Sequence, residues 1–129
     1  MTDTHITDTA AANRRLVTEA MARFAAGDHT VLADVLAEDF IEHSPDNPSG
    51  REAFIAHITN APVARAHLEI ARVIADHRYV VVHYRMDTGD RTGGDAVADI
   101  WRLDDGRITE HWDVVQPVPD PERTPNGMF

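Results

Sequence analysis

Residues 95–116 read DAVADIWRLDDGRITEHWDVVQ, two runs of alternating residues around the turn signal Asp104-Asp-Gly106. Apolar side chains at every second position are typical of a strand with one buried face, and an Asp-Gly pair between two such runs favours a hairpin. We expect a three-residue loop with glycine in the left-handed conformation, which pairs Leu103 with Arg107. The stretch therefore predicts two antiparallel strands near the end of the chain.

A period of two also marks residues 67–75 and 79–87, which predicts a second hairpin, whereas residues before 67 repeat apolar side chains at helical spacing. A chain that forms helices first and a strand meander afterwards has an α+β layout. We expect a curved, mostly antiparallel sheet with three N-terminal helices gathered on one face.

Start and stop signals delimit these helices. The first is expected from about Thr9 to Gly27, and the second follows Asp28 as its cap. The third begins at the capping-box pattern Ser49-Gly-Arg-Glu52, after a short strand over residues 39–43.

The chain of 129 residues fits one domain, which we place at residues 9–116. Residues 1–8 are polar and are expected to form a flexible N-terminus. The tail, residues 117–129, carries four prolines and is not expected to be a central strand.

Composition excludes several kinds of chemistry. The chain has no cysteine, and all 12 basic residues are arginine, which excludes thiol nucleophiles, Fe–S clusters and lysine Schiff bases. A net charge of −10 argues against nucleic acid or an anionic membrane as partner. Neither a membrane-spanning run nor a signal-peptide pattern is visible, so we expect a cytoplasmic protein.

Alternation brings titratable side chains to one face of the last hairpin. The expected loop places Asp99 opposite His111, with Asp113 one step along. Symmetric closure of the loop over residues 88–94 would place His83 opposite Asp99. An imidazole beside a carboxylate is a common proton-transfer pair near neutral pH.

Apolar neighbours on the same face make this polar row the wall of a pocket rather than a solvated stripe. We therefore expect a substrate to contact His83 and three side chains of that wall, Val97, Trp101 and Val115. A satisfied core network without chemistry remains the alternative. His43 ends the short strand before a proline-rich loop, where it could project into the cleft or simply cap the loop.

Histidines and aspartates are also good metal ligands, but the sequence has no fixed ligand spacing such as H-E-x-x-H. Acid–base work accounts for the same residues without an ion. We expect neither a metal nor a cofactor, and no glycine-rich nucleotide motif is present.

The segment Asp99–Gln116, which contains the run Thr-Glu-His-Trp-Asp113, strongly resembles the last hairpin of SnoaL-like proteins. These belong to the NTF2-like superfamily, with polyketide cyclases, ketosteroid isomerase and scytalone dehydratase. Leu36–Pro45 followed by Gly50–Phe54 is similar to the same family's helix–strand–helix entry, and Val80–His83 and the ending Asn126–Phe129 add to the resemblance. It covers the chain from about residue 12 to the C-terminus.

The resemblance implies a cone-shaped fold around one deep pocket and a homodimer formed through the sheet. It also implies that Asp113 is similar to the acid–base catalyst of SnoaL-type cyclases and Asp99 to the oxyanion-binding acid of ketosteroid isomerases. His43 falls where those isomerases carry their base. The first helix has Ala20 and Met21 near the place of the isomerase's oxyanion tyrosine, so we do not expect steroid isomerisation.

The function expected from these residues is cofactor-independent acid–base chemistry on a small, apolar, carbonyl-containing molecule. Asp113 or His43 would remove a proton next to the carbonyl, while Asp99 and His111 tune the site. Cyclisation of the aldol type, isomerisation and dehydration share that enolate step. A small-molecule-binding protein without catalysis is the alternative, and a metal-dependent reaction is a third possibility.

The opposite face of the sheet predicts the homodimer independently of the resemblance. Its apolar side chains are too many to stay in water. By alternation they are Val80, Val82, Tyr84, Ala98, Ile100, Trp112 and Val114.

Overall fold

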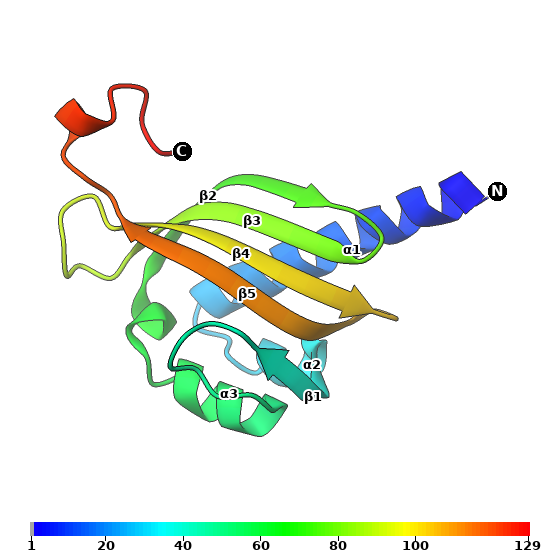
Figure 1. Ribbon diagram of the computed structural model, residues 1–129. Coiled ribbons are helices and arrows are strands. Elements are labelled where there is room, and N and C mark those ends of the chain that lie inside the picture. The colour runs from blue at the N-terminus through cyan, green and yellow to red at the C-terminus, as the bar shows by residue number, and fades with distance from the viewer. Residues whose placement is uncertain (1) are drawn as a thin grey trace.

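Helix α1 runs from Thr2 to Ala25 and ends before Gly27, which takes a φ of 94°. The computed structural model describes residues 2–129, with side chains from His5 onward. The helix begins before the expected start near Thr9, because polar turns can be helical without an apolar stripe; the Thr9 hydroxyl donates to the His5 carbonyl at 2.9 Å. These first turns extend past the sheet (Figure 1). The flexibility expected for residues 1–8 stays a prediction, and Met1 lies outside the described residues.

Two short helices flank the first strand. Helix α2 (Val31–Val35) leads directly into β1 (Leu36–Glu42), so the strand begins earlier than expected. Helix α3 (Arg51–Ile58) has Gly50 as its N-cap and no side-chain cap. The capping box expected at Ser49 is therefore wrong: the Ser49 hydroxyl instead accepts the Glu42 N–H at 3.0 Å.

The strands that follow match the predicted hairpins closely. They pair in the order β1-β5-β4-β3-β2, and only β1 runs parallel to its neighbour. Within residues 2–129 the fold is thus α+β, with three α-helices and a mostly antiparallel, open sheet, as predicted. The strand bounds are β2 (His67–Ala75), β3 (Tyr79–Asp87), β4 (Asp95–Asp104) and β5 (Arg107–Pro117); 3-10 turns cover Pro62–Arg65 and Pro121–Arg123.

The β4–β5 turn is shorter than expected. Asp104 pairs with Arg107, so the turn consists of Asp105 and Gly106, with φ angles of 50° and 77°. A bulge between Arg102 and Leu103 then shifts the register, and Asp99 pairs with Asp113 rather than with His111. The observed and expected registers differ by two residues at this point. An even difference leaves every side chain on its expected face.

Between β3 and β4 the register differs from the expected one by a single residue. His83 pairs with Ala98 instead of Asp99, so its side chain lies on the opposite face from Asp99. For the same reason, three residues expected on the outer face are not there. Val80, Val82 and Tyr84 are buried and point inward. The loop between these strands has no turn signal that determines its closure.

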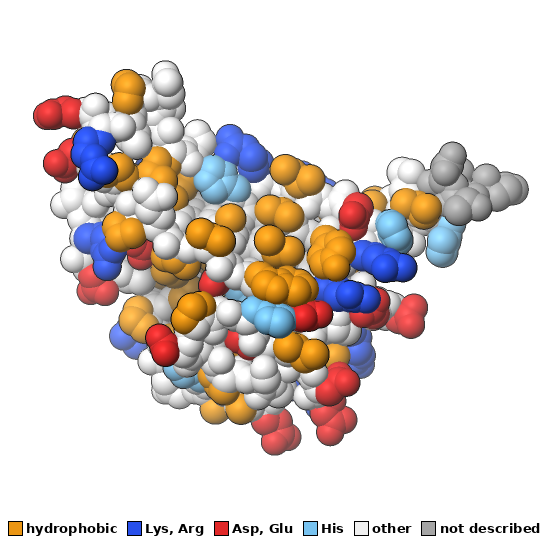
Figure 2. Space-filling view, viewed as in Figure 1, with side chains coloured by type: hydrophobic (Ala, Val, Ile, Leu, Met, Phe, Trp, Pro, Cys, Tyr) orange, Lys and Arg blue, Asp and Glu red, His pale blue; other side chains and the backbone are white. Residues whose placement is uncertain are grey.

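The helices cover one face of the sheet, with α1 behind β2 and β3 in Figure 1. The core lies between them; its largest fully buried side chains include Val17, Leu36, Phe40 and Leu103. The other side of the sheet, called the outer face here, carries apolar side chains that Figure 2 shows gathered over the strands. Cross-strand pairing gives its members as Ile74, Val81, Ile100, Trp112 and Val114.

The C-terminal tail returns to the sheet. The Phe129 ring stacks on His83 with a centroid distance of 5.5 Å, and the Arg85 guanidinium lies 4.4 Å from the centre of the same ring. Among residues 2–129, no helix is long and apolar enough to cross a membrane.

Candidate active site

A cavity of about 370 Å³ lies between the helices and the inner face of the sheet. Asp99, His111 and Asp113 form its polar end. Most of the remaining wall is apolar, and the helices contribute Val17, Met21, Phe24, Leu32, Phe54 and Ile58. A ligand that fills this space therefore meets these titratable groups and a mostly apolar wall, to which the β3–β4 loop and the start of β4 add a second polar patch with Asp90, Arg91 and Asp95.

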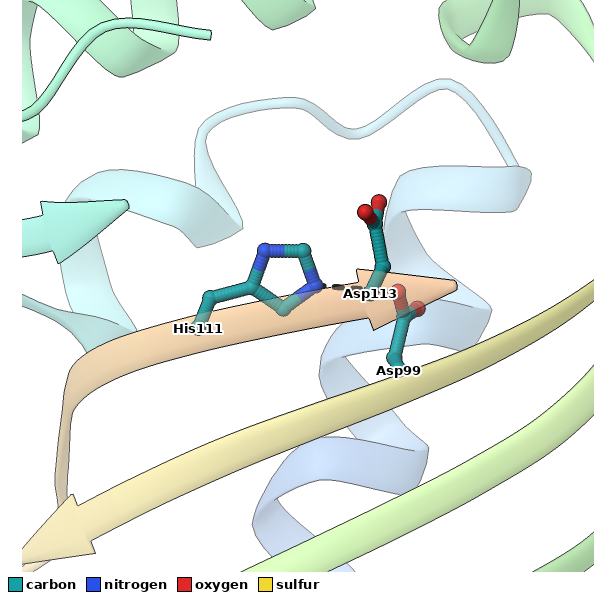
Figure 3. A group of neighbouring side chains, drawn as sticks. All are labelled: Asp99, His111 and Asp113. Carbon is teal, nitrogen blue, oxygen red and sulfur yellow. Dashed lines mark hydrogen bonds and ion pairs between the residues drawn. The ribbon is translucent and has the colours of Figure 1, made fainter. Parts of the chain in front are cut away.

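Alternation along β4 and β5 brings the polar end together. Asp99 projects from β4, and His111 and Asp113 project from β5 on the same face (Figure 3). The His111 Nε2 nitrogen lies 2.9 Å from Asp99 Oδ1, and both residues are only 4% exposed. The Asp–His pair predicted from the sequence forms, although as a diagonal contact and not between directly opposed residues.

Glu42, at the end of β1, is the residue that sequence reasoning missed. Its Oε1 oxygen lies 2.8 Å from His111 Nδ1, and its side chain is fully buried. The same carboxylate accepts the backbone N–H groups of His43 and Ser44, at 2.9 Å and 3.1 Å, and the Asn47 amide at 3.4 Å. The available signal was alternation from the apolar Phe40, which places Glu42 on the inner face.

These two carboxylates hold His111 as an imidazolium. Burial lowers the pKa of His111, but the hydrogen bonds to Asp99 and Glu42 outweigh it and raise the pKa to about 9. The ring also stacks on Trp101, with centroids 3.9 Å apart, and aromatic faces attract cations. With a proton on each nitrogen, His111 donates two hydrogen bonds and has no lone pair with which to accept a proton near neutral pH.

Asp113 has the opposite character. Its burial raises its pKa, and the charges of Asp99 and Glu42 raise it further, against a lowering by the Ser44 hydroxyl and the His111 charge. The carboxylate is only partly buried and reaches the cavity. A carboxylate made more basic in this way is suited to removing a proton from a bound molecule.

Tyr84 completes the polar end from β3. Burial and the charge of Asp99 raise the pKa of its hydroxyl well above the usual value, so the hydroxyl stays protonated and bonds to Asp99. Asp99 therefore receives two hydrogen bonds, one from His111 and one from Tyr84.

Three of the expected substrate contacts, Val97, Trp101 and Val115, line the cavity. His43 does not: adjacent strand residues point to opposite faces, and since Glu42 points inward, His43 points outward. There it stacks on Trp112 at 4.7 Å and meets Glu110 at 2.5 Å.

His83 is likewise outside the cavity, on the outer face, where it contacts Arg72 and Phe129. The single-residue slip of the β3–β4 register explains this position. The expected places of His43 and His83 in the pocket are therefore wrong.

The ligating atoms of Asp99, His111 and Asp113 lie within 4.8 Å of one another, close enough to raise the question of a metal. His111 as it stands does not fit as a ligand, because coordination by an imidazole needs a free lone pair and both of its ring nitrogens are engaged by carboxylates. Acid–base chemistry uses these groups as they stand.

The sequence matches the model of the SnoaL-like domain over residues 17–111. The chain belongs to the SnoaL-like family. None of the curated proteins compared with this SnoaL-like chain matches it.

Solved structures share the fold. An NTF2-like protein of unknown function from Burkholderia xenovorans aligns with a TM-score of 0.76 and 17% identity, over 92% of this chain and 97% of that one. A steroid delta-isomerase from Pseudomonas aeruginosa aligns with a TM-score of 0.68 and 24% identity, over 83% of this chain and 81% of that one. A candidate SnoaL-like polyketide cyclase from a Jannaschia species aligns with a TM-score of 0.69 and 17% identity, over 83% of this chain and 87% of that one. At these identities the likeness establishes the NTF2-like fold of this SnoaL-like chain.

Proposed function

We propose that this SnoaL-like protein is a cofactor-independent enzyme that removes a proton next to the carbonyl of a small, largely apolar molecule. The observation that carries the proposal is Asp113, a carboxylate of raised pKa in a mostly apolar cavity. Cyclisation of the aldol type, isomerisation and dehydration all begin with this step. The names of the cyclase and isomerase among the structural neighbours fit the same class.

The charges of the site suit an enolate. When Asp113 takes up the proton it becomes neutral, and the negative charge moves to the carbonyl oxygen of the substrate. His111 remains an imidazolium throughout, because its nitrogens already donate to Asp99 and Glu42. The imidazolium thus offsets part of the negative charge of Asp99 and Glu42, which would otherwise repel the developing oxyanion.

Replacement of Asp113 by asparagine tests the proposal. Asp113→Asn keeps the shape and removes the proton acceptor, so kcat should fall by about 10²–10⁴-fold while ligand binding is largely retained. Where the natural substrate is unknown, the measurement is deuterium uptake at the carbon next to the carbonyl, followed by NMR with a panel of apolar cyclic ketones in deuterium oxide.

Asp95→Asn is the matched control, because Asp95 also lines the cavity but pairs with Arg91 at 3.2 Å. It should leave the exchange rate within a few-fold of the original, because Asp95 lies outside the group of Asp99, His111 and Asp113. Unchanged exchange in Asp113→Asn would exclude Asp113 as the base. Ketones that bind without any exchange would favour the alternative, a binding protein whose polar end only orients its ligand.

A further inference from the structure

Glu42 makes more contacts than a carboxylate needs for burial alone. A buried charge is tolerated when its oxygens are hydrogen-bonded and an opposite charge is close. The His111 imidazolium meets both conditions, with its Nδ1 nitrogen 2.8 Å from Glu42 Oε1. Three further donors, from His43, Ser44 and Asn47, also bond to the Glu42 carboxylate. They come from the turn that follows β1, so Glu42 joins that turn to β5.

Two branches lead from Glu42 to the cavity. Through His111 it reaches Asp99, since the imidazole lies between the two carboxylates. Through Ser44 it reaches Asp113, since Ser44 gives its backbone N–H to Glu42 and its hydroxyl lowers the pKa of Asp113. Groups that Glu42 holds thus act on both cavity carboxylates, although Glu42 itself is fully buried behind them.

We infer that Glu42 is the positioning residue of this site: it keeps His111 protonated against Asp99 and keeps the Ser44 hydroxyl against Asp113. The inference rests on the proposed function for its kinetic consequence but not for its structural content. Glu42 does not line the cavity, and it acts only through these two neighbours.

Every strand around His111 contributes to its charge state. Glu42 faces it from β1 and Asp99 from β4, Asp113 lies beside it on β5, and the protonated Tyr84 from β3 bonds to Asp99. The helix side chains that line the cavity are apolar and add no charge. The removal of one carboxylate from this set should therefore be measurable at the imidazole itself.

Glu42→Gln is the decisive variant, because it retains an oxygen that can accept the His111 Nδ1–H and loses only the charge. Imidazole resonances of the full-length, isotope-labelled protein are followed by NMR across pH, and the His111 signal is identified among the eight histidines by its absence from His111→Gln. The original protein should titrate at His111 near pH 9, and Glu42→Gln should lower that midpoint by about one pH unit or more.

Glu110→Gln is the matched control, since Glu110 lies on the same strand as His111 but binds His43 on the outer face. It should leave the His111 midpoint unchanged. A merely structural Glu42 would lower stability without moving the midpoint, so an unmoved midpoint in folded Glu42→Gln overturns the inference. So does a His111 midpoint near 6.5, the ordinary imidazole value, in the original protein.

Ser44→Ala keeps the inference falsifiable if Glu42→Gln does not fold. It removes only the hydroxyl that lowers the pKa of Asp113, so the acid limb of the activity or exchange profile should move to higher pH, while the His111 midpoint stays. An acid limb that does not move would overturn the Ser44 branch. The NMR midpoints need no substrate: a shifted midpoint in a protein without any exchange activity would support the positioning role and contradict the proposed enzyme.

Discussion

Three carboxylates lie within one hydrogen-bonded group, and their surroundings give them different chemistry. Burial raises the pKa of Glu42, but its bonds to His111, Ser44 and Asn47 reverse the sign and hold it below the usual value. Asp113 has fewer such partners, and there burial prevails and the pKa rises. Environments that separate the pKa values of neighbouring groups are how one site holds both a fixed charge and a proton acceptor.

The raised pKa of His111 predicts a stability that depends on pH. The folded protein binds this proton more tightly than the unfolded chain, so the stabilisation is complete below pH 6.5 and is lost as pH rises through about 9. We expect the free energy of unfolding to fall by on the order of 3 kcal/mol across this range. Urea unfolding at several pH values measures it.

His111→Gln removes the titrating group and should flatten that dependence, and the exposed His67 offers a matched control as His67→Gln, which should keep it. Glu42 acts with the opposite sign: its lowered pKa contributes stability that is present above 4.5 and lost as pH falls. A stability that stays level up to pH 9 in the original protein would contradict a buried imidazolium.

Strand parity is the part of the site that the sequence could predict. Asp99, His111 and Asp113 share one face in any β4–β5 register that differs from the expected one by an even number of residues. They were therefore placed on the correct face, although Asp99 pairs with Asp113 and not with His111. His83 was misplaced because no turn signal determines the β3–β4 register. His43 was misplaced because its position at a strand end was taken to project into the cleft, whereas alternation turns it outward. Glu42 was missed because its histidine neighbour carries the more conspicuous chemistry.

At the scale of elements, periodicity predicted the hairpins almost to the residue, since side-chain alternation is a property of each strand alone. It could not predict the bulge between Arg102 and Leu103, which depends on how two strands fit together. Nor could an apolar stripe reveal the polar start of α1, where exposed turns are helical without a buried face.

Glycines beside the β4 strand give a test of this local geometry. Gly94 and Gly106 both have positive φ, at 70° and 77°, but a Cβ at Gly94 would lie 2.6 Å from the Met86 carbonyl oxygen, whereas one at Gly106 would meet nothing within 4 Å. Gly106→Ala should cost about 1–2 kcal/mol from backbone strain alone. Gly94→Ala should cost clearly more, as measured by urea unfolding.

Asp105→Gly is the control for the turn. Asp105 has a positive φ of 50°, and glycine adopts such angles without the steric penalty of a side chain, so this variant should not lose the stability that Gly106→Ala loses. Equal losses for Gly94→Ala and Gly106→Ala would show that the β3–β4 loop moves away from the added methyl group.

At the scale of the whole molecule, no helix within residues 2–129 covers the outer face. Ile74 is 63% exposed and Val114 68% exposed, and they belong to the apolar set that also includes Ile100 and Trp112. We propose that a second copy of the chain covers this face. Sedimentation at micromolar concentration should then give twice the monomer mass of 14.3 kDa.

Val114→Arg places a charge in the middle of that face and should yield the monomer. Ala26→Arg, at an exposed position beyond the end of α1, adds the same charge away from the sheet and should leave the dimer intact. A monomeric original protein at these concentrations would contradict the proposed contact, and Val114→Arg would then change nothing.

The two tryptophans of the chain are divided between the faces of the sheet. Trp101 stacks on the protonated His111 inside, and Trp112 stacks on His43 outside. Each indole is thus an intrinsic optical label for one side of the molecule, placed against an imidazole ring. Fluorescence from a Trp112→Phe protein would come from the cavity alone, and fluorescence from a Trp101→Phe protein from the outer face alone.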